Sequence, residues 1–289
     1  GDPMELPQAY RDMPRWWSGE GRSWLDALPS LVASQLDRWH LQPDGELMHG
    51  SHAIVVPVRR GDERLVLRLS PPDQDVAAHV GALRWWDGHG VVRMLEAEPE
   101  RGAMLLARLG KSLDSVPVDE AMAILGATIR RLAIPAPVDV PATEDLIRER
   151  LPELEPEWER LGRPFPRSVL DEAITSAARL VDCRSDDAVN GDLHSGQVLR
   201  DGPNAWAVVD PVLMRGDIAY DLGRALWTRI DDMRVVLDHF DIVVSAAGLD
   251  RDHARDCVVF RTTDYWLWGL GAGLTSDPVR CARLIGALG

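Results

Sequence analysis

The residues best suited to chemistry lie in one short stretch of the chain, between Asn190 and Asp210. Asp192 follows a turn-forming Asn-Gly pair, and Gln197 comes five residues after it. Two short apolar runs around a polar turn then predict a two-strand ribbon that leads to Asp210. Such a ribbon would bring two carboxylates and an amide oxygen together, and Mg²⁺ prefers oxygen ligands of this kind beside phosphate oxygens. A carboxylate left off the metal could accept a proton from a hydroxyl.

This stretch resembles the catalytic loop and metal-binding acid of the aminoglycoside phosphotransferase family, which are small-molecule relatives of protein kinases. The family pattern is His-Gly-Asp-Leu-His-x-x-Asn, then an apolar strand ending in Ile-Asp, and then Gly-Asp-Pro-x-Tyr-Asp-Leu. The matching segments here are Asn190-Gly191-Asp192-Leu193-His194-Ser195-Gly196-Gln197, Val209-Asp210 and Gly216-Asp217-Ile218-Ala219-Tyr220-Asp221-Leu222. The string from Leu83 to Leu95 is similar to the branch that contains streptomycin 6-phosphotransferases and hydroxyurea kinases. The resemblance covers the chain from about Leu41 onward, and the shared order and spacing make it specific.

The resemblance implies an α+β, bilobal protein-kinase-like fold with a small β-rich N-terminal lobe and a larger, mostly helical C-terminal lobe. We expect residues 1–107 to form the lobe that roofs the nucleotide, with a leading helix and an antiparallel sheet. Residues 108–289 would form the helical lobe, with the catalytic loop and the substrate site. We also expect a monomer.

Hydrophobic spacing predicts the elements that must position the loop. In the first part, we expect a helical region at 6–41, a helix at 74–87 ended by Gly88, and strands at 54–58, 64–69, 91–95 and 103–107. In the second part, we expect a helix at 143–161 that has Thr143 as N-cap and is interrupted near Pro152 and Pro156. The other expected helices are 118–133, 168–181, 219–230, 233–247, 250–268 and 278–288.

The resemblance implies a role for each residue of the loop. Asp192 would orient the substrate hydroxyl and accept its proton during phosphoryl transfer. Asp210 would bind the Mg²⁺ that bridges the nucleotide phosphates, and the amide oxygen of Gln197, at the family's asparagine, would be a second ligand. His194 would orient the loop through hydrogen bonds. Two further acids would brace the loop and cap the following helix: Asp217 and Asp221.

The resemblance also implies that the N-terminal lobe binds ATP, with GTP as the alternative nucleotide. Arg68 occupies the strand position where kinases carry a phosphate-binding lysine, and a guanidinium differs from lysine in reach and geometry. Ser51 lies in the loop that would cover the phosphates, although one glycine makes this loop a weak phosphate signal. Backbone groups of the hinge between the lobes, at Ala107 and Leu109, would meet the adenine edge.

Three positions that handle the nucleotide depart from the family pattern. Arg68 replaces lysine, and Gln197 replaces asparagine. His79 occupies the helix position of the usual glutamate, with Asp75 one turn earlier as the alternative. Two other readings therefore stay open beside an active resistance enzyme. One is a kinase-like protein with lost or rewired activity, and the other is an amino-sugar or metabolite kinase.

The formal net charge of −14 disfavours nucleic acid and anionic membranes as partners, since both attract basic surfaces. It suits a cationic substrate, although an acidic balance also serves solubility alone. Asp231, Asp232 and Asp264 are candidate contacts for the amines of such a substrate. The main hypothesis is an ATP- and Mg²⁺-dependent O-phosphotransferase. It would phosphorylate a hydroxyl of a small cationic molecule, such as a streptomycin-like aminoglycoside, and so give antibiotic resistance.

The remaining sequence features concern location. No apolar run approaches the roughly 18 residues of a membrane span, and Gly1-Asp2-Pro3 before Met4 reads as a tag remnant without a signal peptide behind it. The odd number of widely spaced cysteines, Cys183, Cys257 and Cys281, predicts buried thiols rather than disulfides. We therefore expect a cytoplasmic protein.

Overall fold

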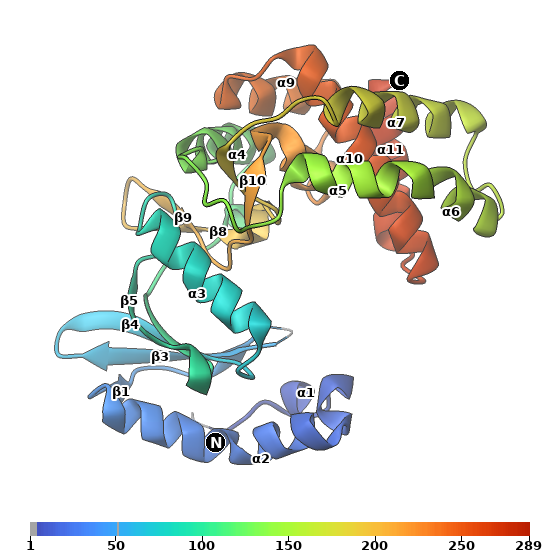
Figure 1. Ribbon diagram of the computed structural model, residues 1–289. Helices are drawn as coiled ribbons and strands as arrows, with labels where there is room; N and C mark the ends of the chain where they lie inside the picture. The colour runs from blue at the N-terminus through green and yellow to red at the C-terminus, as the bar shows by residue number, and fades with distance from the viewer. Residues whose placement is uncertain (1–4, 51) are drawn as a thin grey trace. The chain divides into compact units, whose positions relative to one another are not determined.

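The computed structural model describes residues 5–50 and 52–289 (Figure 1). Ser51, which we expected near the phosphates, and the supposed tag remnant therefore lie outside the described residues. The chain divides into two compact units, Gly1–Leu109 and Gly110–Gly289, each with its own core. In the part of the chain that the structure describes, no helix is both long enough and apolar enough to cross a membrane.

The first unit is built on an antiparallel sheet with the strand order β1-β3-β4-β6-β5, to which β2 adds by pairing with β3. Its strands are β1 (Gln42–Pro43), β2 (Met48–His49), β3 (Ile54–Arg60), β4 (Glu63–Leu69), β5 (Met94–Glu98) and β6 (Ala103–Ala107). Its helices are α1 (Gln8–Arg11), α2 (Gly19–Arg38) and α3 (Gln74–Trp86), with short 3₁₀ turns η1 (Pro14–Trp17) and η2 (Pro99–Arg101).

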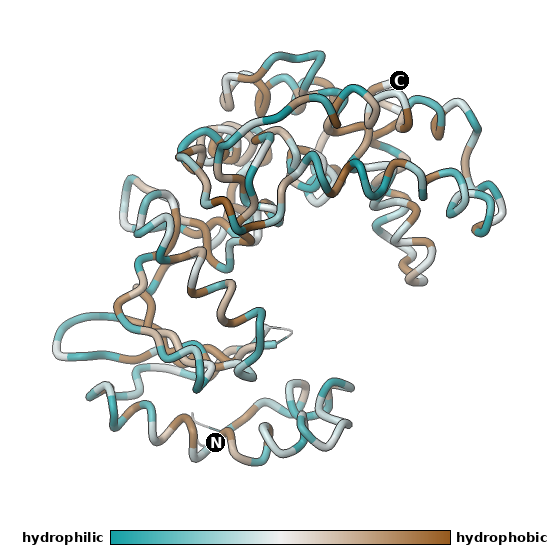
Figure 2. Tube along the Cα trace, in the orientation of Figure 1, coloured by the Kyte–Doolittle hydropathy of each residue, from teal (hydrophilic) through white to brown (hydrophobic). Residues whose placement is uncertain are grey.

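Side-chain alternation along β4 decides which residues of the first unit enter its core. Leu65, Leu67 and Leu69 are buried in one cluster with Leu28 and Val32 of α2. Because successive strand residues point to opposite faces, the side chain of β4 residue 68 faces away from that cluster. Figure 1 shows α2 and α3 on opposite sides of the sheet, and Figure 2 shows hydrophobic and hydrophilic segments following each other along α2.

The second unit is mostly helical and contains two small antiparallel ribbons, β7–β10 and β8–β9. Its strands are β7 (Asp187–Asn190), β8 (Val198–Arg200), β9 (Trp206–Val208) and β10 (Leu213–Gly216). Its α-helices are α4 (Val118–Leu132), α5 (Thr143–Arg150), α6 (Leu154–Arg160), α7 (Arg167–Leu180), α8 (Leu222–Trp227), α9 (Val236–Ala247), α10 (Arg251–Gly271) and α11 (Ser276–Leu288). The 3₁₀ turns are η3 (Leu113–Ser115), η4 (Leu151–Glu153), η5 (Ser195–Gln197), η6 (Ile218–Asp221) and η7 (Ile230–Asp232).

Helix α10 lies at the centre of the second unit and packs against α7, α8 and α11. A buried arginine links distant segments there, because Arg229 donates to the carbonyl oxygens of Leu113 and Val116 at 2.9 and 3.0 Å. It also donates to the hydroxyl of Ser195 at 3.3 Å, within the loop that follows β7. These bonds satisfy a buried cation and attach the loop to the helical frame.

Two predicted boundaries need correction. The strand expected at 91–95 runs from Met94 to Glu98, and Val91 is buried ahead of it. The segment expected as one helix at 219–230 begins as the 3₁₀ turn η6 and continues as the short helix α8.

Ala142, not Thr143, is the N-cap of α5, because the Thr143 hydroxyl accepts a hydrogen bond from the Asp217 backbone N–H at 3.0 Å. A tertiary contact uses the group that would otherwise cap the helix.

Two single-residue predictions are also wrong. The C-cap of α3 is Asp87, which adopts the left-handed conformation with φ 45°, so Gly88 is not the capping residue. Aspartate reaches this conformation more easily than most side chains do. Cys183 is exposed beyond the end of α7, whereas Cys257 and Cys281 are buried as expected.

Candidate active site

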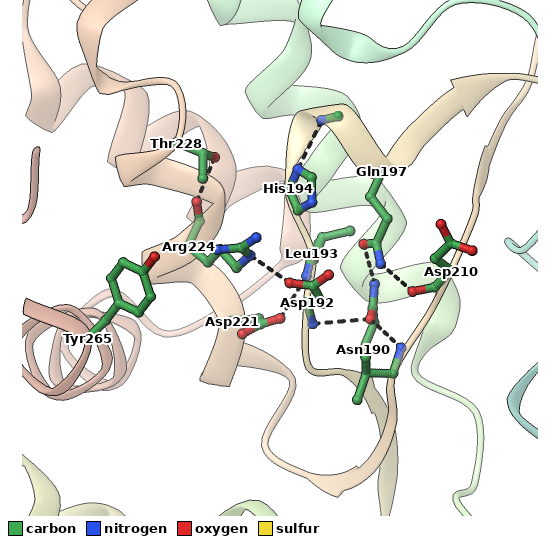
Figure 3. Close-up of polar contacts among 12 residues, drawn as sticks. Asn190, Asp192, Leu193, His194, Gln197, Asp210, Asp221, Arg224, Thr228 and Tyr265 are labelled. Carbon is green, nitrogen blue, oxygen red and sulfur yellow. Dashed lines mark hydrogen bonds and ion pairs between the residues drawn. The ribbon is translucent and has the colours of Figure 1, made fainter. Parts of the chain in front are cut away.

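The predicted ribbon is present and brings Gln197 to Asp210. Strands β8 and β9 pair with Val198 opposite Val208. At the open end of this ribbon, the backbone N–H of Val209, the residue after β9, donates to the carbonyl oxygen of Gln197, the residue before β8, at 2.9 Å. The Gln197 side chain then donates from Nε2 to the Asp210 carbonyl oxygen at 2.8 Å (Figure 3). The ribbon therefore fixes the position of Asp210 relative to the loop.

Asn190, at the end of β7, organises the turn that presents Asp192. Its Oδ1 accepts hydrogen bonds from the backbone N–H groups of Asp192 and Val212, at 3.2 and 3.0 Å. Its Nδ2 donates to Gln197 Oε1 at 2.9 Å, and the side chain is buried. The two positions at which this loop differs from the family pattern, residues 190 and 197, thus contact each other directly. A buried amide with both of its groups satisfied makes the loop rigid.

Gln197 lies where we expected a metal ligand, but its carboxamide is already engaged. Its oxygen accepts from Asn190 and its nitrogen donates to Asp210, while the side chain is only 4% exposed. A carboxamide oxygen can accept at two lone pairs, so one remains for a cation. The assignment of Gln197 as a ligand stays a prediction.

Asp210 combines an exposed side chain with unusual backbone geometry. Its φ is 51°, in the left-handed region that few non-glycine residues adopt. Such conformations persist where the surrounding structure holds them, and here Gln197 holds the Asp210 carbonyl. Figure 3 shows Asp192 and Asp210 on either side of the Asn190–Gln197 pair.

The side chain of Asp192 is held by an arginine from α8. Arg224 Nε lies 2.7 Å from Asp192 Oδ1, and the two side chains are 26% and 39% exposed. Asp192 is therefore fixed in position and still reachable from solvent, as a proton acceptor must be. Half-exposed charges are screened, so we read this pair as positioning rather than as a large contribution to stability.

A second anchor acts on the backbone of the same loop. Asp221 Oδ2 accepts a hydrogen bond from the Leu193 N–H at 2.7 Å, and Asp221 Oδ1 lies 3.0 Å from Arg261 Nη2 of α10. Burial raises the pKa of the Asp221 carboxyl, while the Arg261 guanidinium and the Leu193 N–H oppose that shift. The expectation that Asp221 braces the loop is confirmed.

His194 completes the loop as a local acceptor. Its Nδ1 accepts a hydrogen bond from the Gly196 N–H at 3.2 Å, which agrees with the expected orienting role. Burial lowers the pKa of His194, and the nearby Arg224 cation lowers it further. The imidazole is therefore neutral near pH 7, consistent with accepting a hydrogen bond rather than donating one there.

The candidate nucleotide residues lie in the first unit. Arg68 is half-buried on β4, opposite Val55 and Met104, and its Nη1 donates to the Ser70 hydroxyl at 3.2 Å. Ala107 is the last residue of β6, and its N–H donates to a carbonyl oxygen of residue 93. Leu109 and His79 are half-buried, and Asp75 is exposed. Their roles toward a nucleotide stay predictions.

The three acids proposed for substrate amines are each paired with an arginine. The pairs are Asp231 with Arg280 at 3.0 Å, Asp232 with Arg229 at 2.9 Å and Asp264 with Arg150 at 2.7 Å. Asp231 and Asp232 are exposed, whereas burial raises the pKa of Asp264 against the opposing effect of Arg150. An incoming amine would therefore share these carboxylates with a resident cation.

Sequence reasoning missed Arg224 and the tertiary role of Asn190. One signal was available for Arg224, because it lies three residues after Asp221 and so near the same face of the helical segment. For Asn190 we recognised a turn-forming residue but not its contact with Gln197. That contact depends on how the ribbon returns to the loop.

Comparisons with known proteins agree with this geometry. Residues 38–273 match the family model described as aminoglycoside/hydroxyurea antibiotic resistance kinase. A streptomycin 6-kinase of Streptomyces glaucescens is 36% identical over 95% of this chain and 94% of its own length. A hydroxyurea phosphotransferase of Kitasatospora aureofaciens is 31% identical over 97% of this chain and 84% of its own length.

A solved structure shows the same fold. A thermostable mutant of aminoglycoside phosphotransferase APH(4)-Ia, in a ternary complex with AMP-PNP and hygromycin B, aligns with a TM-score of 0.62. The alignment covers 89% of this chain and 98% of that one at 16% identity. The expected α+β, protein-kinase-like fold is confirmed. The chain therefore belongs to the aminoglycoside and hydroxyurea antibiotic resistance kinases, and it is a small-molecule phosphotransferase of that family.

Proposed function

We propose that this enzyme transfers the γ-phosphoryl group of ATP to a hydroxyl of a small cationic molecule, with Asp192 as the catalytic base. The observation that carries the proposal is the double anchoring of the loop. Asp221 holds its backbone at Leu193, and Arg224 holds the Asp192 side chain. The result is a half-exposed carboxylate in a fixed position, which is what proton transfer from a hydroxyl requires.

The ion pair suggests how the two carboxylate oxygens divide their tasks. Arg224 engages Oδ1 of Asp192, so we assign the other oxygen to the substrate hydroxyl. That oxygen would orient the hydroxyl toward the γ-phosphorus and accept its proton as the new P–O bond forms. The bond from the γ-phosphorus to the bridging oxygen breaks, and ADP leaves with that oxygen.

The residues around Asp210 fit a hard divalent cation. Its carboxylate is exposed, and the neighbouring Gln197 supplies a carboxamide oxygen, so the donors are oxygens of the kind that Mg²⁺ prefers. Asp210 and Gln197 would hold the ion. When bound, Mg²⁺ would neutralise charge on the nucleotide phosphates. The protein contributes the position of Asp210, which Gln197 fixes through the backbone.

The proposed acceptor is an aminoglycoside-like molecule similar to streptomycin. Relatives that share about a third of the sequence carry the names streptomycin 6-kinase and hydroxyurea phosphotransferase. A formal net charge of −14 raises the local concentration of cations around the enzyme and favours a cationic acceptor. Asp231 and Asp232 stay our candidates for amine contacts. The less exposed Asp264, which lies 2.7 Å from Arg150, is assigned a structural role instead.

For the nucleotide, we propose ATP bound by the first unit, in a monomeric enzyme. Arg68 would contact phosphate oxygens, and backbone groups at Ala107 and Leu109 would meet the adenine. We also assign a phosphate contact to Ser51, which lies outside the described residues. Residues 1–107 would thus act as the nucleotide lobe, and residues 108–289 would carry the acceptor site.

The test measures ADP release with Mg·ATP or Mg·GTP and a panel of acceptors: streptomycin, other aminoglycosides, hydroxyurea and amino sugars. Mass spectrometry of the acceptor should show one added phosphoryl group. Activity on streptomycin well above hydroxyurea and the amino sugars supports the assignment. Nucleotide binding without transfer to any acceptor would instead support the rewired, kinase-like alternative.

A separate variant tests the assignment of Asp210 as a Mg²⁺ ligand. Asp210→Asn should lose most activity at moderate Mg²⁺ and regain part of it at high Mg²⁺, since a weakened site needs more of the ion. Asp201→Asn is the matched control, because Asp201 is an exposed acid in the turn of the same ribbon. Equal magnesium dependence in the parent and Asp210→Asn would remove Asp210 as a ligand.

A further inference from the structure

A cluster of side chains of the types that ligate metals lies outside the catalytic loop, where η6 meets α10. Asp217 Oδ2 is 2.5 Å from His253 Nε2 and 3.5 Å from Cys257 Sγ, and the nitrogen and the sulfur are 3.9 Å apart. These three ligand atoms lie within 4.8 Å of one another. They supply oxygen, nitrogen and sulfur, a donor set that suits a borderline-soft cation such as Zn²⁺ and not Mg²⁺.

The local sequence builds this cluster. His253 and Cys257 lie four residues apart on α10, so their side chains project from the same face one turn apart. Asp217 comes from the start of η6, where its other carboxylate oxygen caps the turn by accepting from the Ala219 N–H at 2.9 Å. Asp256, next in sequence to Cys257, is excluded because it is engaged by residues of α7, Ser176 and Arg179.

We propose that Asp217, His253 and Cys257 form a Zn²⁺ site. In a tetrahedral zinc site, with metal–ligand distances of roughly 2.0–2.3 Å, neighbouring ligand atoms lie about 3.3–3.6 Å apart. The oxygen–sulfur and nitrogen–sulfur distances are already near this range. The oxygen–nitrogen pair would open by less than about 1 Å when the metal replaces the shared proton.

The exposed fractions of the three side chains fit a metal site that is buried on one side and open to solvent on the other. Cys257 is 1% exposed, whereas the side chains of Asp217 and His253 are 13% and 31% exposed. The open side would admit the ion and leave a fourth position for water. Zinc binding would release to solvent the proton of the Cys257 thiol and the proton of the Asp217–His253 hydrogen bond.

Such an ion would fasten α10 to the segment that supports the catalytic loop. Asp217 is the N-cap of η6, and η6 ends at Asp221, whose carboxylate accepts a hydrogen bond from the Leu193 N–H. Zinc would therefore stabilise the second unit without taking part in phosphoryl transfer. This effect is separate from Mg²⁺ at Asp210, so the zinc site can be tested whether or not the enzyme is active.

The experiment uses Co²⁺ as a spectroscopic substitute for Zn²⁺ on the whole, chelator-treated protein. We expect one Co²⁺ per chain, with the thiolate-to-cobalt charge-transfer absorption of a bound cysteine, displaced by equimolar Zn²⁺. Cys257→Ser should abolish this absorption, and His253→Ala should weaken Co²⁺ affinity at least tenfold. Zn²⁺ should raise the melting temperature of the parent but not of His253→Ala.

Two matched variants control for the other thiols. Cys281→Ser removes a buried cysteine on α11, and Cys183→Ser removes the exposed one. Both should keep the charge-transfer absorption. Absence of the absorption in the folded parent would show that the cluster is only a hydrogen-bonded one. Its persistence in Cys257→Ser would show that another thiol binds the ion and would overturn the proposed site. Should Cys257→Ser fail to fold, the melting temperatures of parent and His253→Ala with and without Zn²⁺ still decide the question.

Discussion

The catalytic loop and the acids proposed for acceptor binding both present negative charge on the second unit, but they hold it differently. In the loop, Asn190 and Asp221 accept hydrogen bonds from the backbone N–H groups of Asp192 and Leu193, and Arg224 fixes the Asp192 side chain. The two exposed acceptor acids are held through side-chain ion pairs: Asp231 pairs with Arg280, and Asp232 pairs with the buried Arg229.

The carboxylate of Asp192 is therefore held in a defined position, whereas the carboxylates of Asp231 and Asp232 are mainly neutralised by their arginine partners. A base for phosphoryl transfer needs a defined place, because a small displacement from the reacting hydroxyl costs rate. A contact for a cationic substrate needs only local negative charge, and an exposed ion pair can exchange partners at little cost. We therefore expect changes in the loop to alter kcat and changes in the exposed acids to alter KM.

The largest expected effect comes from removing the base. Asp192→Asn should lower kcat by about 10²- to 10⁴-fold, the usual contribution of general acid–base catalysis, because the amide cannot accept the proton. KM for ATP should stay within a factor of about two, since Asp192 is assigned to the acceptor hydroxyl. Steady-state kinetics with Asp201→Asn as the control measures this. A variant with parental kcat would eliminate Asp192 as the base.

The next effect concerns the positioning of Asp192. Arg224→Ala should lower kcat by about 10- to 100-fold, because the carboxylate loses its fixed orientation. Added guanidinium chloride should restore part of the rate, and Arg224→Lys should lie between parent and alanine variant. The matched control is Arg234→Ala, an exposed arginine of the same unit. A rise in kcat in Arg224→Ala would mean that the ion pair restrains the base instead of positioning it.

Asp264 should behave as a structural acid despite its place among the acceptor candidates. Its side chain is 16% exposed and lies 2.7 Å from Arg150, which also pairs with Glu157 at 2.6 Å. Asp264→Asn should lower the free energy of unfolding by about 1–2 kcal/mol, less than for a fully buried pair because Arg150 keeps one partner and some solvent contact. Urea unfolding measures this. A raised acceptor KM at unchanged stability would return Asp264 to the substrate site.

The smallest effect is expected at the exposed acids. Asp231→Asn should raise KM for a cationic acceptor about two- to fivefold and leave kcat unchanged, the range of an exposed ion pair. The increase should shrink in high salt, since solvent-exposed charges are screened. Kinetics at two ionic strengths with a cationic and a neutral acceptor test it. An equal change for both acceptors would rule out a charge contact.

Local chemistry made much of the site predictable. The turn residues, the ribbon and the order of the acids are close in sequence, so their pattern indicated both the loop and its partners Gln197 and Asp210. The predictions failed where a distant segment used a group that local rules assign elsewhere. Thr143 does not cap α5 because its hydroxyl accepts from the Asp217 N–H, and Cys183 is exposed because the chain leaves α7 at that point.

What the sequence alone determined is the set of reactive groups and the short-range geometry around them, because turns and hairpins depend on neighbouring residues. Only the tertiary structure decided which charges are compensated. Arg224 reaches Asp192, and Asp221 reaches Leu193 across 28 residues, through the packing of η6 and α8 beside the loop. Cys257, His253 and Asp217 likewise meet only after α10 docks on η6. Ion pairs and ligand clusters depend on distances in space, which a linear pattern does not contain.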